Sequence, residues 1–255
     1  TAGGAVLLHS TGAGAITLSG NITASGGNTT AGTNDGGDAG VITVRNDSGS
    51  ILIDDVTATG GTSAGGTAGA AGTIQLSATT TIAQQAATDI TAAGGNLKLV
   101  STGGDVTLNN VTNTVAIVAA DLTGASSLSY TDADGLSIGM IAQAGTGNAQ
   151  LAAETGIVAT GADETVTVTS LTGQLTVDDV ITTTSGNVEL MATAGALLID
   201  AAVTTTAGTA TLTAGTTITS TAAGTITTTG ENAADQGTAG GAVLLHSTGA
   251  GAITL

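Results

Sequence analysis

The sequence lacks most of the residues from which globular cores and many functional sites are built. Its 255 residues include no cysteine, proline, tryptophan or phenylalanine, and a single tyrosine. Without aromatic side chains, a conventional core loses its largest contributors of buried area. Without cysteine, neither a disulfide framework nor a thiolate metal site can form. Proline would remove hydrogen-bond donors from a sheet, so its absence favours uninterrupted strand pairing.

Positive charge is also scarce. Two basic residues stand against 19 acidic ones, which gives a formal net charge of −17. Nucleic-acid binders need a basic surface, so this class of protein is excluded. No apolar run approaches the roughly 20 residues that a membrane-spanning helix requires, so no transmembrane segment is expected. The 41% share of hydrophobic residues is nevertheless too high for a disordered acidic chain.

What the sequence does contain is a long internal repeat. Residues 1–18 read TAGGAVLLHSTGAGAITL, and residues 238–255 read the same, letter for letter. The offset between the two copies is 237 residues. Residues 1–237 are therefore predicted to be one unit of a tandem array in a very large polypeptide. Residues 238–255 are predicted to begin the next, identical unit.

Shorter motifs recur inside this unit. A triplet of two apolar residues around a variable one is followed by a glycine-rich turn, a second triplet and a third apolar position. Alternation with a period of two indicates a strand with one buried side, so Leu99 and Val118 are expected to point inward. The first triplets begin at Val6, Ile42, Ile74, Leu97, Ala116, Ala149, Val166, Val188, Ala210 and Val243.

The three-strand module predicts an all-β fold, a parallel β-helix in which like coils stack on like. We expect about nine or ten coils per repeat, with loop insertions at the longer spacings and an additional strand around Leu128 and Tyr130. A sandwich of antiparallel hairpins is the alternative. It would favour two-residue turns between strands of similar length, and the fixed order of the module does not fit that pattern.

Three glycine-rich inserts separate a third strand from the following first strand. They are residues 25–40, 59–72 and 229–241. If the long repeat continues, the inserts fall in three consecutive coils and project from the same side, where they could stack as a rib. Independent flexible loops are the alternative.

Several phrases resemble the central repeats of filamentous-haemagglutinin-type exoproteins, which are very large bacterial surface adhesins. They include Gly14-Ala-Ile-Thr-Leu-Ser-Gly-Asn-Ile-Thr23 and Ser127-Leu-Ser-Tyr-Thr-Asp-Ala-Asp-Gly-Leu-Ser-Ile-Gly139. The resemblance covers nearly the whole chain through degenerate motifs. It implies a right-handed parallel β-helix, secretion to the cell surface and a role as a stalk or adhesin.

Candidate sites for chemistry are few. Asp132 and Asp134, and likewise Asp35 and Asp38, are weak candidates for calcium ligands, because their loops lack the full ligand pattern of a calcium site. Calcium is the only cofactor that the sequence suggests. His9, which recurs at position 246, is expected to face outward and has no triad partners at catalytic spacing.

Paired carboxylates at Asp54-Asp55 and Asp178-Asp179 do not converge if they lie on strands, because adjacent strand residues face opposite ways. We therefore expect no enzymatic activity. The outward positions of the first triplets form no threonine ladder, which argues against ice binding.

The sequence thus predicts an extracellular filament or adhesin shaft. Its expected partners are adjacent repeats joined head to tail, with lateral bundling into fibres as a further possibility. The alternative function is a binding module in which the glycine-rich rib recognises host-cell or matrix glycans.

Overall fold

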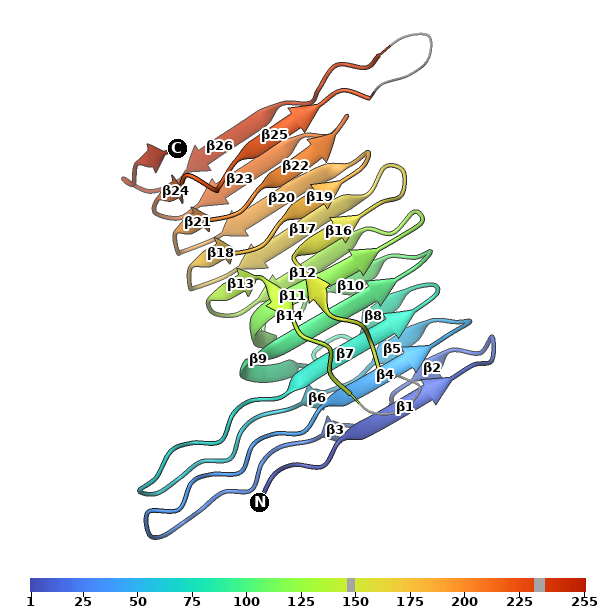
Figure 1. Cartoon of the computed structure of the whole chain (residues 1–255), viewed down its shortest axis with the longest axis vertical. Helices are drawn as coiled ribbons and strands as arrows, with labels where there is room; N and C mark the ends of the chain where they lie inside the picture. The colour runs from blue at the N-terminus through green and yellow to red at the C-terminus, as the bar shows by residue number, and fades with distance from the viewer. Residues whose placement is uncertain (146–149, 232–236) are drawn as a thin grey trace.

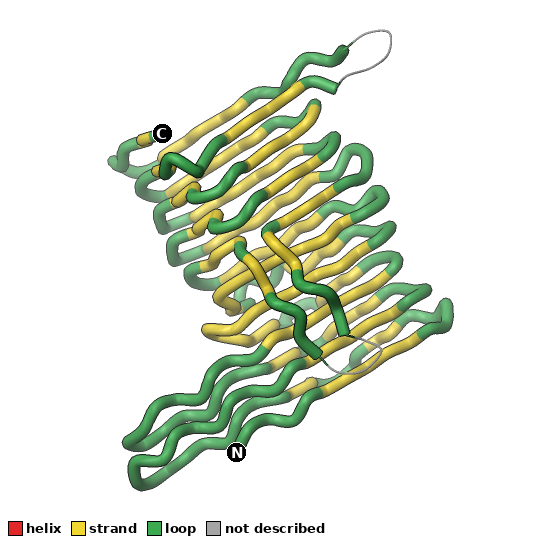
Figure 2. The backbone as a smooth tube through the Cα atoms, viewed as in Figure 1, coloured by secondary structure: helices red, strands yellow, loops and turns green. Residues whose placement is uncertain are grey.

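The computed structural model describes residues 1–145, 150–231 and 237–255. These residues form no helix, and about 47% of the structure is strand. The strands run as parallel legs of a solenoid whose axis is vertical in Figure 1, and Figure 2 shows the glycine-rich loops leaving its edges. The prediction of an all-β parallel solenoid is confirmed.

Two stacks of strands form the walls of the solenoid, and we call them column A and column B. In each stack, every strand pairs in parallel with the strand of the next coil. Column A contains β1 (Val6–Ser10), β4 (Ile42–Asn46), β7 (Thr73–Ala78), β9 (Ile90–Ser101), β11 (Thr114–Leu122), β13 (Leu136–Ile138), β18 (Leu175–Val177), β21 (Leu197–Ile199), β24 (Ile218–Ser220) and β27 (Ile253–Thr254). Column B contains β2 (Ile16–Thr17), β5 (Ile51–Ile53), β8 (Ile82–Gln84), β10 (Val106–Leu108), β12 (Leu128–Asp132), β17 (Thr165–Ser170), β20 (Asn187–Ala192), β23 (Ala210–Ala214) and β26 (Val243–Ser247).

Shorter strands extend the sheet of column A. Near the N-terminus, β3 (Ile22–Thr23) and β6 (Val56–Thr57) lead to the first part of β9. From the last part of β11, the series continues through β16 (Ile157–Ala159), β19 (Ile181–Thr183), β22 (Val203–Thr206) and β25 (Ile226–Thr229). The antiparallel pair β14 (Met140–Ile141) and β15 (Glu154–Thr155) lies outside both columns.

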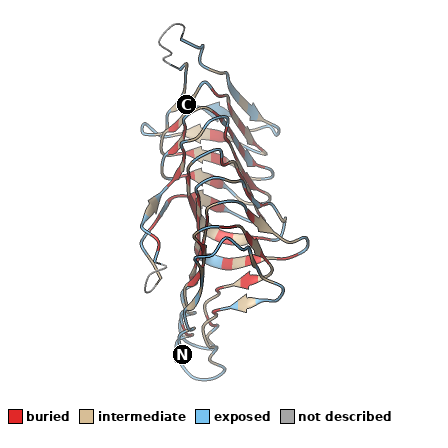
Figure 3. Cartoon of the chain, turned by 90° about the vertical axis from the view of Figure 1, so that its right-hand side faces the viewer, coloured by how far each residue is buried: buried red, intermediate tan, exposed pale blue. Residues whose placement is uncertain are grey.

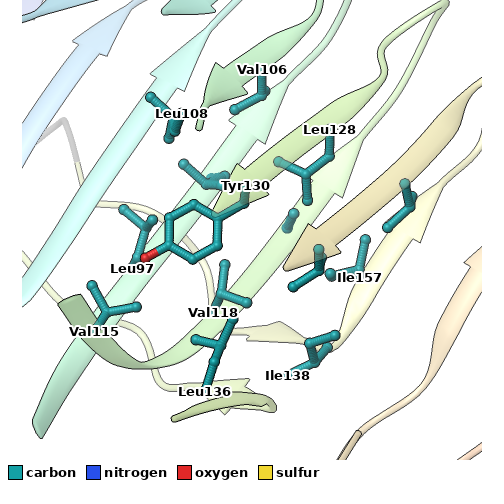
Figure 4. Close-up of a cluster of buried hydrophobic side chains, with 14 of the residues drawn as sticks. Leu97, Val106, Leu108, Val115, Val118, Leu128, Tyr130, Leu136, Ile138 and Ile157 are labelled. Carbon is teal, nitrogen blue, oxygen red and sulfur yellow. The ribbon is translucent and has the colours of Figure 1, made fainter. Parts of the chain in front are cut away.

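The inward side chains of both columns meet in one continuous core. Val, Ile, Leu and Ala fill it, and Figure 3 shows the buried positions following the axis of the solenoid. Leu99 and Val118 are fully buried, as predicted. Tyr130, the single tyrosine, is also fully buried, among Leu97, Val118 and other aliphatic side chains (Figure 4).

The additional strand predicted around Leu128 and Tyr130 is β12. Its place in column B overturns part of the predicted stacking. Val106, which begins a second triplet in β10, pairs with Leu128 of β12. Leu128 in turn pairs with Val166, which begins a first triplet in β17. Column B therefore changes from second triplets to first triplets across β12. From β17 onward, the first triplets lie in column B and the second triplets in column A, because β12 adds one leg to the winding.

The predicted first triplet at Ala149 begins outside the described residues. Its last residue, Leu151, forms an isolated antiparallel bridge with Ala144. In the described part of the chain, nine legs of column A and eight of column B, from β1 to β24, precede the second copy of the repeated segment. Counted over its described residues, one repeat makes eight and a half coils, slightly fewer than the nine or ten expected.

Replacing Leu99 by aspartate should test the buried face. We expect Leu99→Asp to lower the free energy of unfolding by at least about 3 kcal/mol, because an unpaired charge would be buried. Thr107→Asp on the exposed face of β10 is the matched control and should cost less than about 1 kcal/mol. Chemical denaturation of both variants measures the difference, and equal losses would contradict the inward assignment.

Candidate functional site

The first two glycine-rich inserts, residues 25–40 and 59–72, form an ordered two-layer arm that we call the rib. Backbone hydrogen bonds join the layers along the outgoing segment, where Gly26 N donates to Thr59 O at 2.9 Å. They also join the layers along the returning segment, where Ala39 N donates to Ala70 O at 2.8 Å. The predicted stacking of these two inserts is therefore confirmed, and the alternative of independent flexible loops is wrong for them (Figure 2).

Within each layer, the outgoing and returning segments also bond to each other. Gly37 N donates to Gly27 O, and Gly69 N donates to Gly61 O, each at 2.9 Å. The backbone of the rib thus has partners along the stack and across the arm. Such pairing satisfies polar groups that would otherwise lose hydrogen bonds when the segments pack together.

Close approach of the backbones explains the glycines of the rib. A Cβ placed on Gly69 would lie 1.9 Å from Gly37 O, and one on Gly26 would lie 1.7 Å from the same atom. Neither glycine has a positive φ, so space and not conformation requires it. Gly66, Gly69 and Gly72 recur at every third residue, which is the period of a polyproline II helix.

The predicted calcium ligands Asp35 and Asp38 belong to this rib. Thr67 N donates to Asp35 Oδ1 at 2.7 Å, and Ala70 N donates to Asp38 Oδ1 at 2.7 Å. Both carboxylates therefore link one layer to the next. Each carboxylate thus already accepts a hydrogen bond from the protein. Calcium binding by Asp35 and Asp38 stays a prediction.

Replacing Gly69 by alanine should separate the layers of the rib. The added methyl group collides with backbone, so we expect Gly69→Ala to cost about 1–3 kcal/mol locally. Amide hydrogen exchange should accelerate in residues 25–40 and 59–72, while the columns keep their protection. Gly4→Ala is the control, because no atom lies within 4 Å of its Cβ position. Equal exchange in both variants would refute the packing.

The third insert extends from the opposite edge of the solenoid. Its described residues, 229–231 and 237–241, leave the upper right of Figure 1, whereas the rib leaves the lower left. The glycines at the ends of the inserts pack on different columns. A Cβ on Gly241, which precedes β26, would meet O of Gly208, which precedes β23 in column B. A Cβ on Gly40, which precedes β4, would meet O of Gly4, which precedes β1 in column A.

The other predicted calcium ligands, Asp132 and Asp134, lie at the end of β12. Asp132 is fully buried and accepts hydrogen bonds from Tyr130 Oη at 2.7 Å and Val115 N at 3.0 Å. Asp134 N donates to Asp132 Oδ1, the other carboxyl oxygen of Asp132, at 3.1 Å. Burial raises the pKa of Asp132 to about 7. This carboxyl serves the core, and calcium binding by the pair stays a prediction.

The raised pKa of Asp132 gives a testable pH dependence. The folded protein keeps this proton up to about pH 7, whereas an unfolded chain releases it near pH 4. The contribution of Asp132 to stability is therefore present at low pH and lost as pH rises to 7.

We expect the difference between the Tm of Asp132→Asn and the Tm of the wild type to change by several degrees in favour of the variant as the pH rises from 4.5 to 8. Glu189→Gln, on the outer face of β20, controls for the change in net charge. Melting curves across this pH range measure the effect, and parallel curves for the two variants would contradict it.

A flap, of which residues 139–145 and 150–156 are described, covers part of column A, with β14 and β15 as its paired strands (Figure 2). Beneath it lie Thr43, Gln75 and Lys98, which are the middle residues of the first triplets at Ile42, Ile74 and Leu97. They point away from the core, but the flap buries them. A Cβ on Gly145 would lie 3.3 Å from Thr43 Oγ1, which shows how closely the flap sits.

Lys98 and Glu154 form the charged contact under the flap. Lys98 Nζ lies 3.9 Å from Glu154 Oε1, and the lysine side chain is fully buried. Burial lowers the pKa of Lys98, and burial raises the pKa of Glu154. Such a pair adds little stability, because removing both charges from water costs about as much as their attraction returns. No sequence motif indicates this contact, because its two partners are 56 residues apart.

A groove beside the flap brings the single arginine close to His9. Arg45 Nε donates to Asp47 Oδ1 at 2.5 Å, and His9 Nε2 lies 2.8 Å from Asp47 Oδ2. The Arg45 hydrogen bond, and then that of His9, lowers the pKa of Asp47. His9 faces outward, as predicted, and so does His246. The groove is lined by Arg45, Asn46, Asp47, Ser77, Ala78, Thr79, Val100, Thr102, Gln150, Leu151 and Ala152.

The predicted carboxylate pairs take part in turns. Asp55 Oδ1 accepts a hydrogen bond from Asp89 N at 2.7 Å, and both Asp178 N and Asp179 N donate to Ile138 O. In the described residues, no group of three or more histidine, aspartate or glutamate side chains could hold a metal ion.

No family model, curated protein or solved structure matches the chain. Among the described residues there is also no helix long and apolar enough to cross a membrane.

Proposed function

We propose that the chain is a unit of an extracellular structural shaft, built from tandem solenoid repeats as in a filament or adhesin stalk. One observation supports this proposal above the others. The second copy of the repeated segment stacks directly on the first repeat, with β26 paired in parallel along β23 and β27 along β24. The boundary between repeats thus lies inside continuous sheets and not in a linker.

The mechanics of a shaft follow from this pairing. Each coil covers the inward side chains of its neighbours, so a longer array gains buried surface at every added coil. The last coil exposes the apolar residues Val243 and Ile253, which pair with the buried residues Ala210 and Ile218 and which a further coil in the same register would cover. A secreted location and a role in adhesion come only from the resemblance to haemagglutinin-type repeats and are part of this proposal.

A chain of two complete repeats provides the test. Seventeen coils at about 4.8 Å each should form a uniform rod of roughly 80 Å in negative-stain electron microscopy. The rod should be straight through the boundary, because the hydrogen-bonded columns cross it. Two compact particles joined at a variable angle would overturn the proposal.

The second candidate is a glycan-binding module, which the order and projection of the rib favour. Thr33 and Asn34 are exposed near its tip. The rib has no aromatic side chain on which a sugar ring could stack. A glycan array separates the two functions. Selective binding that is lost in the double variant Thr33→Ala, Asn34→Ala would favour the binding module, and a blank array would favour the shaft alone.

A further inference from the structure

Identical sequences occupy opposite walls of this solenoid. The segment Val-Leu-Leu-His-Ser forms β1 in column A, where it pairs with β4. The same five residues form β26 in column B, where they pair with β23. The segment that follows also changes walls, because β2 lies in column B and its copy β27 lies in column A.

The change of wall follows from the number of legs in one repeat. Legs alternate strictly between the columns from β1 to β27 in the described chain, apart from the short strands that extend column A. Seventeen legs precede β26, and an odd number returns the chain to the opposite wall. The leg that makes the number odd is β12, which lies between a first triplet in β11 and a second triplet in β13.

The position of β12 is fixed on both sides. Leu128 pairs with Val106 below and with Val166 above, and all three side chains are buried. The Tyr130 hydroxyl and Val115 N bond to Asp132 inside the core, which ties the end of β12 to column A. The extra leg is therefore part of the core and not a loop that could be displaced.

We infer that each repeat turns the next by half a coil, so that the glycine-rich ribs of successive repeats lie alternately on opposite sides of the rod. This inference rests on the tandem shaft proposed above. The third insert already lies on the edge opposite to the rib (Figure 1), and it immediately precedes β26, the copy of β1. The copies of residues 25–40 and 59–72 in the next repeat would stack beside it.

Residues 1–4 show how that stacking is made. They repeat residues 238–241, the last part of the third insert. Gly27 N donates to Thr1 O at 2.8 Å, and Gly3 N donates to Asp38 O at 2.7 Å. Each rib in an array therefore has three layers, of which the first comes from the preceding repeat. A shaft of this kind presents ribs on two opposite sides, so two neighbouring molecules can contact equivalent surfaces.

Pairs of introduced cysteines test the winding in this chain, which has no cysteine of its own. Outward residues of paired strands lie about 4.8 Å apart, within the range of a disulfide. Ile117 pairs with Ser137 across β11 and β13, so Ile117→Cys with Ser137→Cys should cross-link on mild oxidation. Thr107→Cys with Ser129→Cys should do the same, because these residues pair across β10 and β12.

The matched control is Thr107→Cys with Ser137→Cys. These residues would pair only if second triplets stacked on second triplets, with no half-coil turn. We expect no intramolecular disulfide in this variant, as measured by thiol counting and peptide mass mapping. Far-UV circular dichroism checks that all variants keep the β fold. A cross-link between positions 107 and 137, with none between 117 and 137, would overturn the inference.

The array itself is tested with the two-repeat chain. Thr33, exposed near the tip of the rib, is replaced by cysteine in both repeats and labelled with gold for electron microscopy. We expect the two labels on opposite sides of a straight rod. A straight rod with both labels on one side would overturn the half-coil turn while leaving the shaft intact. A variable bend between two particles would overturn the shaft and this inference with it.

Discussion

The structure depends on parallel pairing between successive coils. Each leg is only a few residues long and buries its inward side chains against legs above and below, so no coil is stable alone. Core residues such as Val106, Leu128 and Val166 are fully buried because they are register partners in neighbouring strands, so each covers the next along the axis. The same constraint explains the composition. Proline would interrupt the columns, and aromatic side chains rarely fit between closely spaced legs, with Tyr130 the exception.

Departures from the stack follow the same rule of satisfying the backbone. The rib leaves the solenoid as two glycine-rich layers, and its peptide groups bond along the stack and across each layer. The flap leaves it between β13 and β16 and buries polar residues of column A, among them Lys98. Acidic side chains at these places bond mainly to backbone amides, as Asp35, Asp38 and Asp132 do. A chain with so few cations relies on amide donors to satisfy its carboxylates.

The number of legs links local structure to the form of an assembly. A single additional strand, held in the core by Tyr130 and Asp132, decides on which wall the next repeat begins. The chemistry of a rib is the same on either side, since its sequence is repeated. What changes is where neighbouring ribs point, and this is a geometric property of the whole winding.

The sequence by itself determined the strand class, the inward residues and the repeat. A period of two identifies a strand and its buried side from local chemistry, which is why Leu99, Val118 and even the extra strand at Leu128 could be predicted. It did not determine which legs pair, because first and second triplets have the same apolar pattern and can stack on one another equally well. Only the tertiary structure placed β17 above β12, folded the flap over Lys98 and buried Asp132 beside Tyr130. These contacts join residues from different coils, and their energies depend on which coils are neighbours.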